Sequence, residues 1–198
     1  MSSHFFAMLS RMKYIHRWAL MRNSYPENIS EHSLEVAVLS HALATIGNVR
    51  LGKTLNAEKA ALIAVFHDTP EIITGDMPTP IKYFNEDTRG AFKKVEDDAA
   101  EKLLALLPED LRPSYEGLFF AADNESEEDK YIRRLVKAAD RLSALIKCIE
   151  EAKAGNREFE GAMAGIKERL GEMHLPEVDA FCEEFLPSYE KNLDELYS

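Results

Sequence analysis

The stretch AALIAVFHDTPEIITGDMPTP, residues 60–80, combines the two features that decide the fold. Its first half is apolar at three- and four-residue spacing, which is typical of a buried helix face. Its second half contains three prolines, so a regular helix cannot continue through it. The stretch therefore predicts a helix that begins near Asn56 and is disturbed at Pro70, followed by an ordered loop over residues 75–80.

The same helical spacing recurs along nearly the whole chain, whereas sustained alternation of β-branched residues is absent. The sequence therefore predicts an all-α fold, a single helical-bundle domain over residues 1–198 with additional C-terminal helices. The expected helices span residues 3–21, 30–46, 56–69, 84–107, 126–154, 158–170 and 177–197, with a short helix ending near residue 122.

Charge and cysteine content narrow the classes of partner. The net charge of −11 repels the phosphates of polymeric nucleic acid and of anionic membranes, so an anionic substrate must be small and locally captured. No run of residues approaches the 18 or so apolar positions of a membrane span. Cys148 and Cys182 each stand among apolar residues, which favours free thiols in a reducing compartment. We therefore expect a cytoplasmic protein.

The adjacent pair His67-Asp68 is the first candidate for chemistry. It ends an apolar helical stripe, where a charged pair is costly unless it has a partner. Asp68 follows Ala64 by four residues and His67 follows it by three, so both can face the same interior. A surface or helix-capping pair is the alternative interpretation.

Two further polar residues occupy apolar stripes of other predicted helices. His32 stands four residues before Val36, and Asp140 stands four after Val136. Taken singly, His32 can be a satisfied core histidine and Asp140 an ion-pair partner of a neighbouring lysine or arginine. Together with His67 and Asp68 they form a nitrogen and oxygen donor set that suits one divalent transition-metal ion, with cobalt, manganese, zinc, iron and copper as candidates.

The pattern H…HD…D made by these residues is that of the HD-domain metal-dependent phosphohydrolases, an all-helical superfamily. Within that superfamily the chain resembles the bacterial 5'-deoxynucleotidases over nearly its whole length, although the stretch 92–130 is similar mainly in helical pattern. The motifs that carry the likeness are His4-Phe5-Phe6, Ser10-Arg11, Arg17-Trp18, Met21-Arg22-Asn23, Ser30-Glu31-His32-Ser33, His67-Asp68, Glu71, Thr74-Gly75-Asp76, Pro78-Thr79-Pro80 and Lys82-Tyr83-Phe84.

The resemblance implies a role for each matching residue. It implies that the metal ligands are His32, His67, Asp68 and Asp140, and that the two aspartates also contact the substrate. Arg17 would orient the substrate phosphate, and Trp18 would shape the pocket around the deoxyribose. The substrate-lining loop would comprise Asp76, Met77, Pro78 and Thr79, with Asp76 and Arg17 counted among the catalytic residues. Glu71 would transfer the proton.

Each of these roles has an ordinary alternative. Glu71 can be an exposed helix carboxylate, Arg17 a surface cation and Trp18 a core anchor. Asp76 can serve a turn by bonding local amides. Pro70 stands where a small, helix-tolerant residue is expected, and it predicts a kink just before Glu71.

The resemblance thus implies a metal-dependent enzyme that hydrolyses 2'-deoxyribonucleoside 5'-monophosphates to deoxyribonucleosides and phosphate. Another nucleotide phosphohydrolase, such as a triphosphohydrolase, is one alternative, and a non-catalytic nucleotide-binding regulatory module is another. The resemblance also implies a homodimer, for which Phe181, Phe185 and Tyr189 could serve, although a monomer core uses such residues equally well.

Overall fold

The computed structural model describes residues 2–82 and 84–198; Tyr83, which belongs to one of the motifs above, lies outside the described residues. The described chain is all-α, as predicted, and its β-type pairing is limited to an isolated bridge between His16 and Asn28. The helices are α1 Phe5–Leu9, η1 Ser10–Tyr14 (a 3₁₀ helix), α2 Ile29–Leu51, α3 Ala57–Phe66, α4 Glu71–Thr74, α5 Thr79–Lys82, α6 Glu86–Leu104, α7 Arg112–Phe119, α8 Glu127–Lys153, η2 Arg157–Phe159 (3₁₀), α9 Glu160–Gly171, α10 Pro176–Glu184, η3 Leu186–Glu190 (3₁₀) and α11 Leu193–Leu196. Among these helices of the described residues, none has both the length and the apolar run that a membrane crossing needs.

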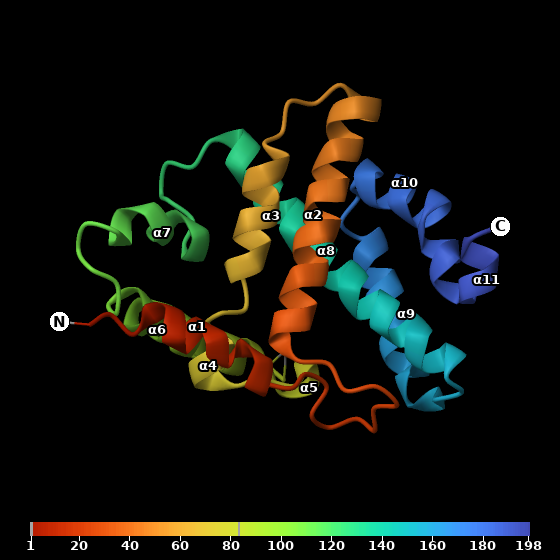
Figure 1. Ribbon diagram of the computed structural model, residues 1–198, viewed down its shortest axis with the longest axis horizontal. Helices are drawn as coiled ribbons and strands as arrows, with labels where there is room; N and C mark the ends of the chain where they lie inside the picture. Colours follow the sequence, from red (N-terminus) through yellow and green to blue (C-terminus); the bar gives the residue numbers. More distant parts are fainter. Residues whose placement is uncertain (1, 83) are drawn as a thin grey trace.

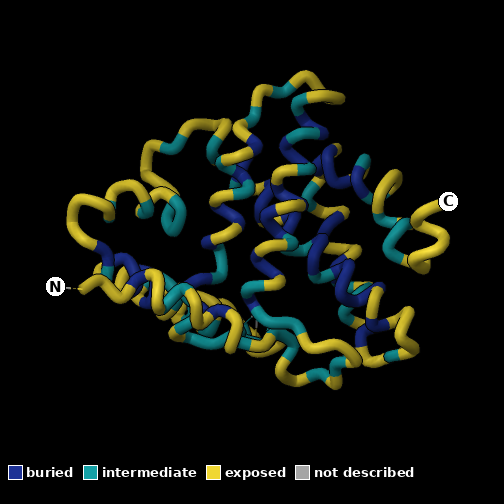
Figure 2. Tube along the Cα trace, viewed as in Figure 1, coloured by how far each residue is buried: buried dark blue, intermediate teal, exposed yellow. Residues whose placement is uncertain are grey.

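Helices α2, α3 and α8 form the centre of the molecule (Figure 1). The predicted stripe of α2 faces this centre, since Val36, Leu39, Leu43 and Ile46 are all buried. Full burial of one such side chain contributes about 1.5–3 kcal/mol, so packing contributes more to the stability of α2 than intrinsic helix propensity does. Buried positions concentrate on these central helices (Figure 2).

A second apolar cluster seats the N-terminus and fixes the end of α3. Phe5 of α1 is fully buried against Phe66, Leu103 and Leu104. Because Phe66 directly precedes His67, this packing determines where the chain leaves α3 and where the His-Asp pair begins.

The start of α2 is set by a capping box. The Asn28 side chain accepts hydrogen bonds from the amides of Ser30 and Glu31, and the Glu31 carboxylate accepts one from the Asn28 amide. These bonds satisfy free amides of the first turn and fix the register of His32, one turn further on. The expected end of this helix before Gly47 was wrong, because α2 continues to Leu51. Interior glycine costs only about 1 kcal/mol relative to alanine, which the packing of α2 outweighs.

The expected helix over residues 3–21 was also wrong. Helix α1 and the 3₁₀ helix η1 end at Tyr14, and residues 15–28 form a loop. Trp18 has φ 61°, in the left-handed region that a right-handed helix cannot contain. The loop closes on itself, since the Arg17 amide donates to the Glu27 carbonyl at 3.0 Å.

Prolines account for further differences from the expected helices. The expected helix over residues 177–197 is divided into α10, η3 and α11, with Pro187 in the first turn of η3. The loop expected over residues 75–80 instead gives way to α5 at Thr79, because Pro80 falls in a first turn, where no amide is needed. The kink expected at Pro70 is present: α3 ends at Phe66, and α4 begins at Glu71.

A buried ion pair of α8 holds the 15–28 loop against the core. The Glu151 carboxylate accepts hydrogen bonds from the amides of Ser24 and Tyr25, and Lys147 donates both to Glu151 and to the Tyr25 carbonyl. The side chains of Lys147 and Glu151 are 5% and 1% exposed. These bonds hold the pKa of Glu151 at about 2: burial raises it, but Lys147, Asn156 and the loop amides lower it further.

Replacing Glu151 by alanine is therefore expected to destabilise the fold strongly. The change leaves Lys147 buried without its carboxylate, so we expect Glu151→Ala to lower the free energy of unfolding by about 3–5 kcal/mol in urea titrations at pH 7. Since the pKa of Glu151 is lowered in the folded state, this stabilisation is present above about pH 4.5 and is lost as the pH falls toward 2.

Glu158→Ala is the matched control for this prediction. Glu158 pairs at 2.9 Å with Arg22 of the same loop, but the Arg22 side chain is 93% exposed. An exposed pair contributes at most about 1 kcal/mol. Equal losses in the two variants would contradict a special role for the buried pair.

Candidate active site

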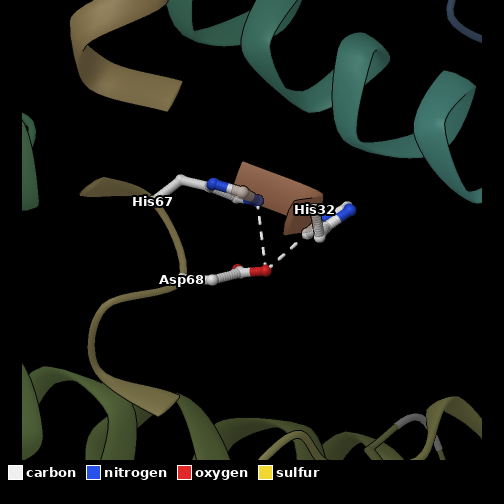
Figure 3. A group of neighbouring side chains, drawn as sticks. All are labelled: His32, His67 and Asp68. Carbon is white, nitrogen blue, oxygen red and sulfur yellow. Dashed lines mark ion pairs between the residues drawn. The ribbon is translucent and has the colours of Figure 1, made fainter. Parts of the chain in front are cut away.

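Two histidines and a carboxylate meet where α3 ends beside the first turn of α2. His67 caps the C-terminus of α3, Asp68 follows it, and His32 approaches from α2. Oδ2 of Asp68 lies 3.2 Å from Nε2 of His67 and 3.4 Å from Nε2 of His32. Figure 3 shows this carboxylate oxygen facing both imidazole rings.

Helix α8 supplies a second carboxylate to the same place. Oδ1 of Asp140 lies 3.3 Å from Nε2 of His32, and Oδ2 of Asp140 accepts a hydrogen bond from Lys137 at 2.9 Å. The structure therefore brings together all four residues of the H…HD…D pattern, which come from α2, from the end of α3 and from α8. We call these four residues the histidine–carboxylate cluster.

The cluster fits a metal ion by its chemistry and by its unused atoms. One ligand atom each of His32, His67 and Asp68 lies within 4.8 Å of the others. The Nε2 atoms of both histidines are buried and have no hydrogen-bond partner, although buried polar atoms in proteins are nearly always paired. Two imidazoles and two carboxylates form a donor set that suits a divalent transition metal.

Electrostatics keep Asp68, Asp140 and His32 in ligand form, whereas the charge of Asp68 outweighs burial and raises the pKa of His67. The pKa of Asp68 is held below its usual range, because His67 and His32 outweigh the effect of burial. The pKa of Asp140 is lowered well below its usual range, since Lys137 and His32 outweigh burial there. Burial and the charge of Arg17 lower the pKa of His32, which favours the neutral imidazole. Metal ligands of these types bind as carboxylate and neutral imidazole.

Glu71 lies close to the cluster but not on the helix of His67. The four-residue spacing of His67 and Glu71 favours one shared helical face, but the turn at residues 67–70 separates α3 from α4, so the two residues do not share one. Glu71 is 8% exposed, so the exposed-carboxylate alternative is excluded, and its Oε2 has no hydrogen-bond partner. Burial and the charges of Asp68 and Asp76 raise the pKa of Glu71 to about 10. Glu71 therefore holds a proton at neutral pH beside the cluster.

A cavity of about 270 Å³ opens at the cluster. Its wall includes His67, Asp68, Glu71 and Asp140 together with Lys82 and Lys137. The two lysines are salt-bridged to carboxylates, Lys82 to Glu96 at 2.6 Å and Lys137 to Asp140 at 2.9 Å. Neither lysine was predicted from the sequence as a site residue. The signals available were the Lys82-Tyr83-Phe84 motif and the position of Lys137 one turn before Asp140.

The loop residues Arg17 and Trp18 are joined to the loop that carries Asp76. The Trp18 amide donates to Oδ2 of Asp76 at 3.2 Å, and the Trp18 indole donates to Glu27 at 3.0 Å. The indole packs edge-on against Phe159 with ring centroids 5.3 Å apart. Asp76 thus bonds a distant loop rather than its own turn, and Trp18 is only half-buried.

Arg17 faces the acidic side of the cluster. Its side chain is 12% exposed, lies 3.6 Å from Glu27, and has a buried Nη1 without a hydrogen-bond partner. Burial lowers the pKa of Arg17, but Glu27, then Asp68 and Asp140, raise it above its usual value. Arg17 is thus a buried cation with an unused donor near two carboxylates of the cluster, not a surface arginine.

The remaining predicted substrate residues are less enclosed. Met77 and Pro78 are half-buried, and Thr79 is exposed at the start of α5. The walls of the 270 Å³ cavity include neither these three residues nor the pair Arg17 and Trp18.

Comparison with known proteins identifies relatives over nearly the whole chain. The family described as "5'-deoxynucleotidase YfbR-like" matches residues 4–189. A 5'-deoxynucleotidase of Erwinia tasmaniensis is 48% identical over 194 residues, which cover 98% of this chain and 96% of the relative. A 5'-deoxynucleotidase of Vibrio cholerae is also 48% identical, with 98% of each chain covered.

Solved structures share the fold at lower identity. An HD-domain phosphohydrolase from Listeria innocua aligns with a TM-score of 0.80 and 21% identity over 98% of this chain and 92% of its own. A cyanophage S-2L HD phosphohydrolase, bound to dA and one catalytic Zn²⁺ ion, aligns with a TM-score of 0.63 and 22% identity over 94% and 96% of the two chains. The fold is therefore that of the HD-domain phosphohydrolases, and at the level of sequence the chain belongs to the YfbR-like 5'-deoxynucleotidase family.

Proposed function

We propose that the protein is a metal-dependent 5'-deoxynucleotidase, which uses water to convert 2'-deoxyribonucleoside 5'-monophosphates to deoxyribonucleosides and inorganic phosphate. The observation that carries the proposal is the histidine–carboxylate cluster beside the buried carboxyl group of Glu71, whose Oε2 has no hydrogen-bond partner. The 48% identity to 5'-deoxynucleotidases over nearly the full length supports the same activity. Residues 1–198 would act as one HD-type phosphohydrolase domain.

In this proposal His32, His67, Asp68 and Asp140 hold one divalent ion, with zinc, manganese, cobalt, iron and copper as candidates. Such an ion offsets the charge of a phosphate and lowers the pKa of a water molecule. The unpaired Nε2 atoms of the two histidines support the assignment of these ligands. Asp68 and Asp140 would also border the substrate, since both line the cavity.

Arg17 would supply a positive charge for the substrate phosphate, and Glu71 would supply a proton for the leaving oxygen. The planar guanidinium of Arg17 matches phosphate oxygens, and its Nη1, which is ion-paired to Glu27 at 3.6 Å but makes no hydrogen bond, can donate to one. Water oxygen bonds to phosphorus while the bond from phosphorus to the 5'-oxygen breaks, and the leaving oxygen needs a proton. Glu71 carries one at neutral pH and is the group that can donate it, and the proton lost by the attacking water then returns Glu71 to its protonated form.

Trp18 and the loop of residues 76–79 would recognise the sugar. Asp76 holds the Trp18 backbone in its left-handed conformation through the 3.2 Å bond to the amide, so it acts on the indole by positioning it. Strained conformations of this kind persist where the surroundings fix them and are common at functional sites. Met77, Pro78 and Thr79 continue the same loop and would complete the wall around the nucleoside.

Trp18→Ala is expected to narrow the gap between deoxyribonucleotide and ribonucleotide rates. A rigid indole against C2' would exclude a 2'-hydroxyl sterically, and alanine leaves space for it. The measurement is kcat/KM for matched deoxy- and ribonucleoside 5'-monophosphates. Tyr25→Ala, at a 77% exposed aromatic side chain of the same loop, is the control and should preserve the wild-type ratio. An unchanged ratio in Trp18→Ala would remove the proposed role of the indole.

The experiment that tests the activity starts from chelator-treated protein. Phosphate release is measured from deoxy- and ribonucleoside 5'-monophosphates after manganese, cobalt, zinc, iron or copper is added separately. We expect release that needs metal and is confined to the deoxy series. Equal release from both series would contradict the sugar selectivity. Hydrolysis of deoxynucleoside triphosphates assayed in parallel, without release from the monophosphates, would indicate a different HD-type phosphohydrolase. Metal binding without any release would favour a regulatory nucleotide-binding module.

The proposal also covers the oligomeric state and the cellular compartment of the protein. Of the three residues expected at a homodimer contact, Phe181 is buried and Tyr189 half-buried, whereas Phe185 is 39% exposed beside an apolar groove that also includes Val49. The groove supports a homodimer, which light scattering would detect as twice the 22.4 kDa chain mass. Cys148 and Cys182 are free thiols, which supports a reducing, cytoplasmic setting.

A further inference from the structure

His32 has a second set of contacts on the side of its ring away from the cluster. Its Nδ1 lies 2.9 Å from Oγ of Ser143, and this Oγ lies 2.5 Å from Oε2 of Glu35. His32 and Ser143 are fully buried, and Glu35 is half-buried. The contacts form a continuous chain from a carboxylate through a hydroxyl to the imidazole.

Helical register places Glu35 and Ser143 one turn from the histidine–carboxylate cluster. Glu35 follows His32 by three residues on α2, and Ser143 follows Asp140 by three residues on α8. Residues three apart share a helix face, so the stripes that bring His32 and Asp140 together also bring Glu35 and Ser143 together.

The chemistry of the three groups fixes the direction of the hydrogen bonds. Above its pKa of about 7, which burial raises, the Glu35 carboxylate is ionised and can only accept, so the single hydroxyl proton of Ser143 is donated to it. The Ser143 oxygen must then accept from His32, which places the imidazole proton on Nδ1. A neutral imidazole has one donor and one acceptor, so Nε2 is left with its lone pair directed at the cluster.

We infer that Glu35, acting through Ser143, is a positioning residue that holds His32 in the Nδ1-protonated tautomer and so presents Nε2 to the divalent ion. The inference rests on the proposed function, because it concerns the ion of that site. The partner of a metal-binding imidazole fixes ring orientation and tautomer, and its loss commonly weakens metal affinity about 10–100-fold.

His67 provides an internal comparison. Its Nδ1 lies 2.7 Å from the Ala64 carbonyl, which can only accept, so His67 is held in the same tautomer by the backbone. Substitutions at Ser143 or Glu35 remove the hydrogen bonds that fix the tautomer of His32 and leave the hydrogen bond that fixes the tautomer of His67. His32 therefore reports on the hydrogen bonds from Ser143 and Glu35, and His67 reports on the general integrity of the site.

The first test reads the tautomers in the chelator-treated protein at pH 8. This pH lies above the pKa of Glu35, which burial raises to about 7, so the carboxylate is mostly ionised. Long-range ¹⁵N–¹H correlation spectra should show both His32 and His67 protonated at Nδ1. In Ser143→Ala, His32 should lose this fixed tautomer while His67 keeps it. A wild-type His32 protonated at Nε2 would overturn the inference without any variant.

The second test measures the affinity for cobalt alone by calorimetric titration at the same pH. We expect Ser143→Ala and Glu35→Ala to bind cobalt about 10–100-fold more weakly. Glu35→Gln keeps an oxygen that accepts from Ser143, so its loss should be smaller than that of Glu35→Ala.

Ser40→Ala is the matched control for both tests. Ser40 is another fully buried serine of α2, and its hydroxyl has no hydrogen-bond partner in the described structure. The variant should keep wild-type tautomers and cobalt affinity. Unchanged cobalt affinity in both Ser143→Ala and Glu35→Ala would overturn the inference. Absence of phosphate release by cobalt-loaded wild type, with the expected tautomers and affinities, would instead contradict the proposed function alone.

Discussion

Asp68→Ala is expected to abolish phosphate release and to remove bound metal while leaving the helical circular dichroism largely intact. Asp68 is the point of contact between the two histidines, since one of its oxygens lies within 3.4 Å of both Nε2 atoms. Its loss removes a proposed ligand and the charge that raises the pKa of His67, whereas the apolar core of α2, α3 and α8 does not involve it. Metal content and phosphate release are measured on the same preparation.

Asp123→Ala is the control for this change, because Asp123 is exposed in the loop before α8. It should retain wild-type metal content and rate. Retained phosphate release in Asp68→Ala would contradict the assignment of the site, and a loss of helical signal would mean that the variant reports on folding instead.

Glu71→Gln is expected to lower kcat by about 10²–10⁴-fold, the usual contribution of a positioned acid or base. Glutamine keeps the shape of the side chain and cannot give up a proton to the leaving 5'-oxygen. Because Glu71 is separate from the proposed ligands, metal content should stay at the wild-type level. A fall in metal content equal to the fall in kcat would show that Glu71 acts through the metal rather than as the proton donor.

The pH dependence of stability offers a second measurement on this variant. The pKa of Glu71 is raised in the folded state to about 10, so the unfolded state binds fewer protons and the wild type loses stability as the pH rises above about 4.5. Glutamine does not titrate, so the variant does not lose stability in this way as the pH rises. In chelator-treated protein, Glu71→Gln should therefore gain stability relative to the wild type between pH 5 and pH 8. Glu109→Gln, at an exposed carboxylate, should show no such trend.

The central helices and the cluster could be predicted from the sequence because both depend on helical periodicity. The stripe of α2 that buries Leu39 and Leu43 also directs His32 inward, and the same holds for Asp140 on α8. A polar residue in an apolar stripe is visible in the sequence, and only its partners must be inferred. The caps by Asn56 and Ser126 likewise agree with the expected helix starts.

The loops around the site could not be predicted in the same way. Trp18 has a left-handed backbone and its amide donates to Asp76, 58 residues away, and no local pattern encodes that contact. The hydrogen bonds that join Glu35, Ser143 and His32 were missed for a related reason. A serine in an apolar helix gives no sign of function in the sequence, because its partner on another helix is not known. Long-range polar contacts thus account for most of what the sequence left open.

The position of Asp140 on α8 has a consequence for the newly made chain. Translation proceeds at about 5–20 residues per second, so the 72 residues from Thr69 to Asp140 take about 4–14 s to add. During that interval α2 and α3 lack both their packing partner and the fourth proposed ligand. A metal ion that meets the growing polypeptide on the ribosome finds an incomplete set of donors, so loading is expected to follow the docking of α8 rather than to guide it.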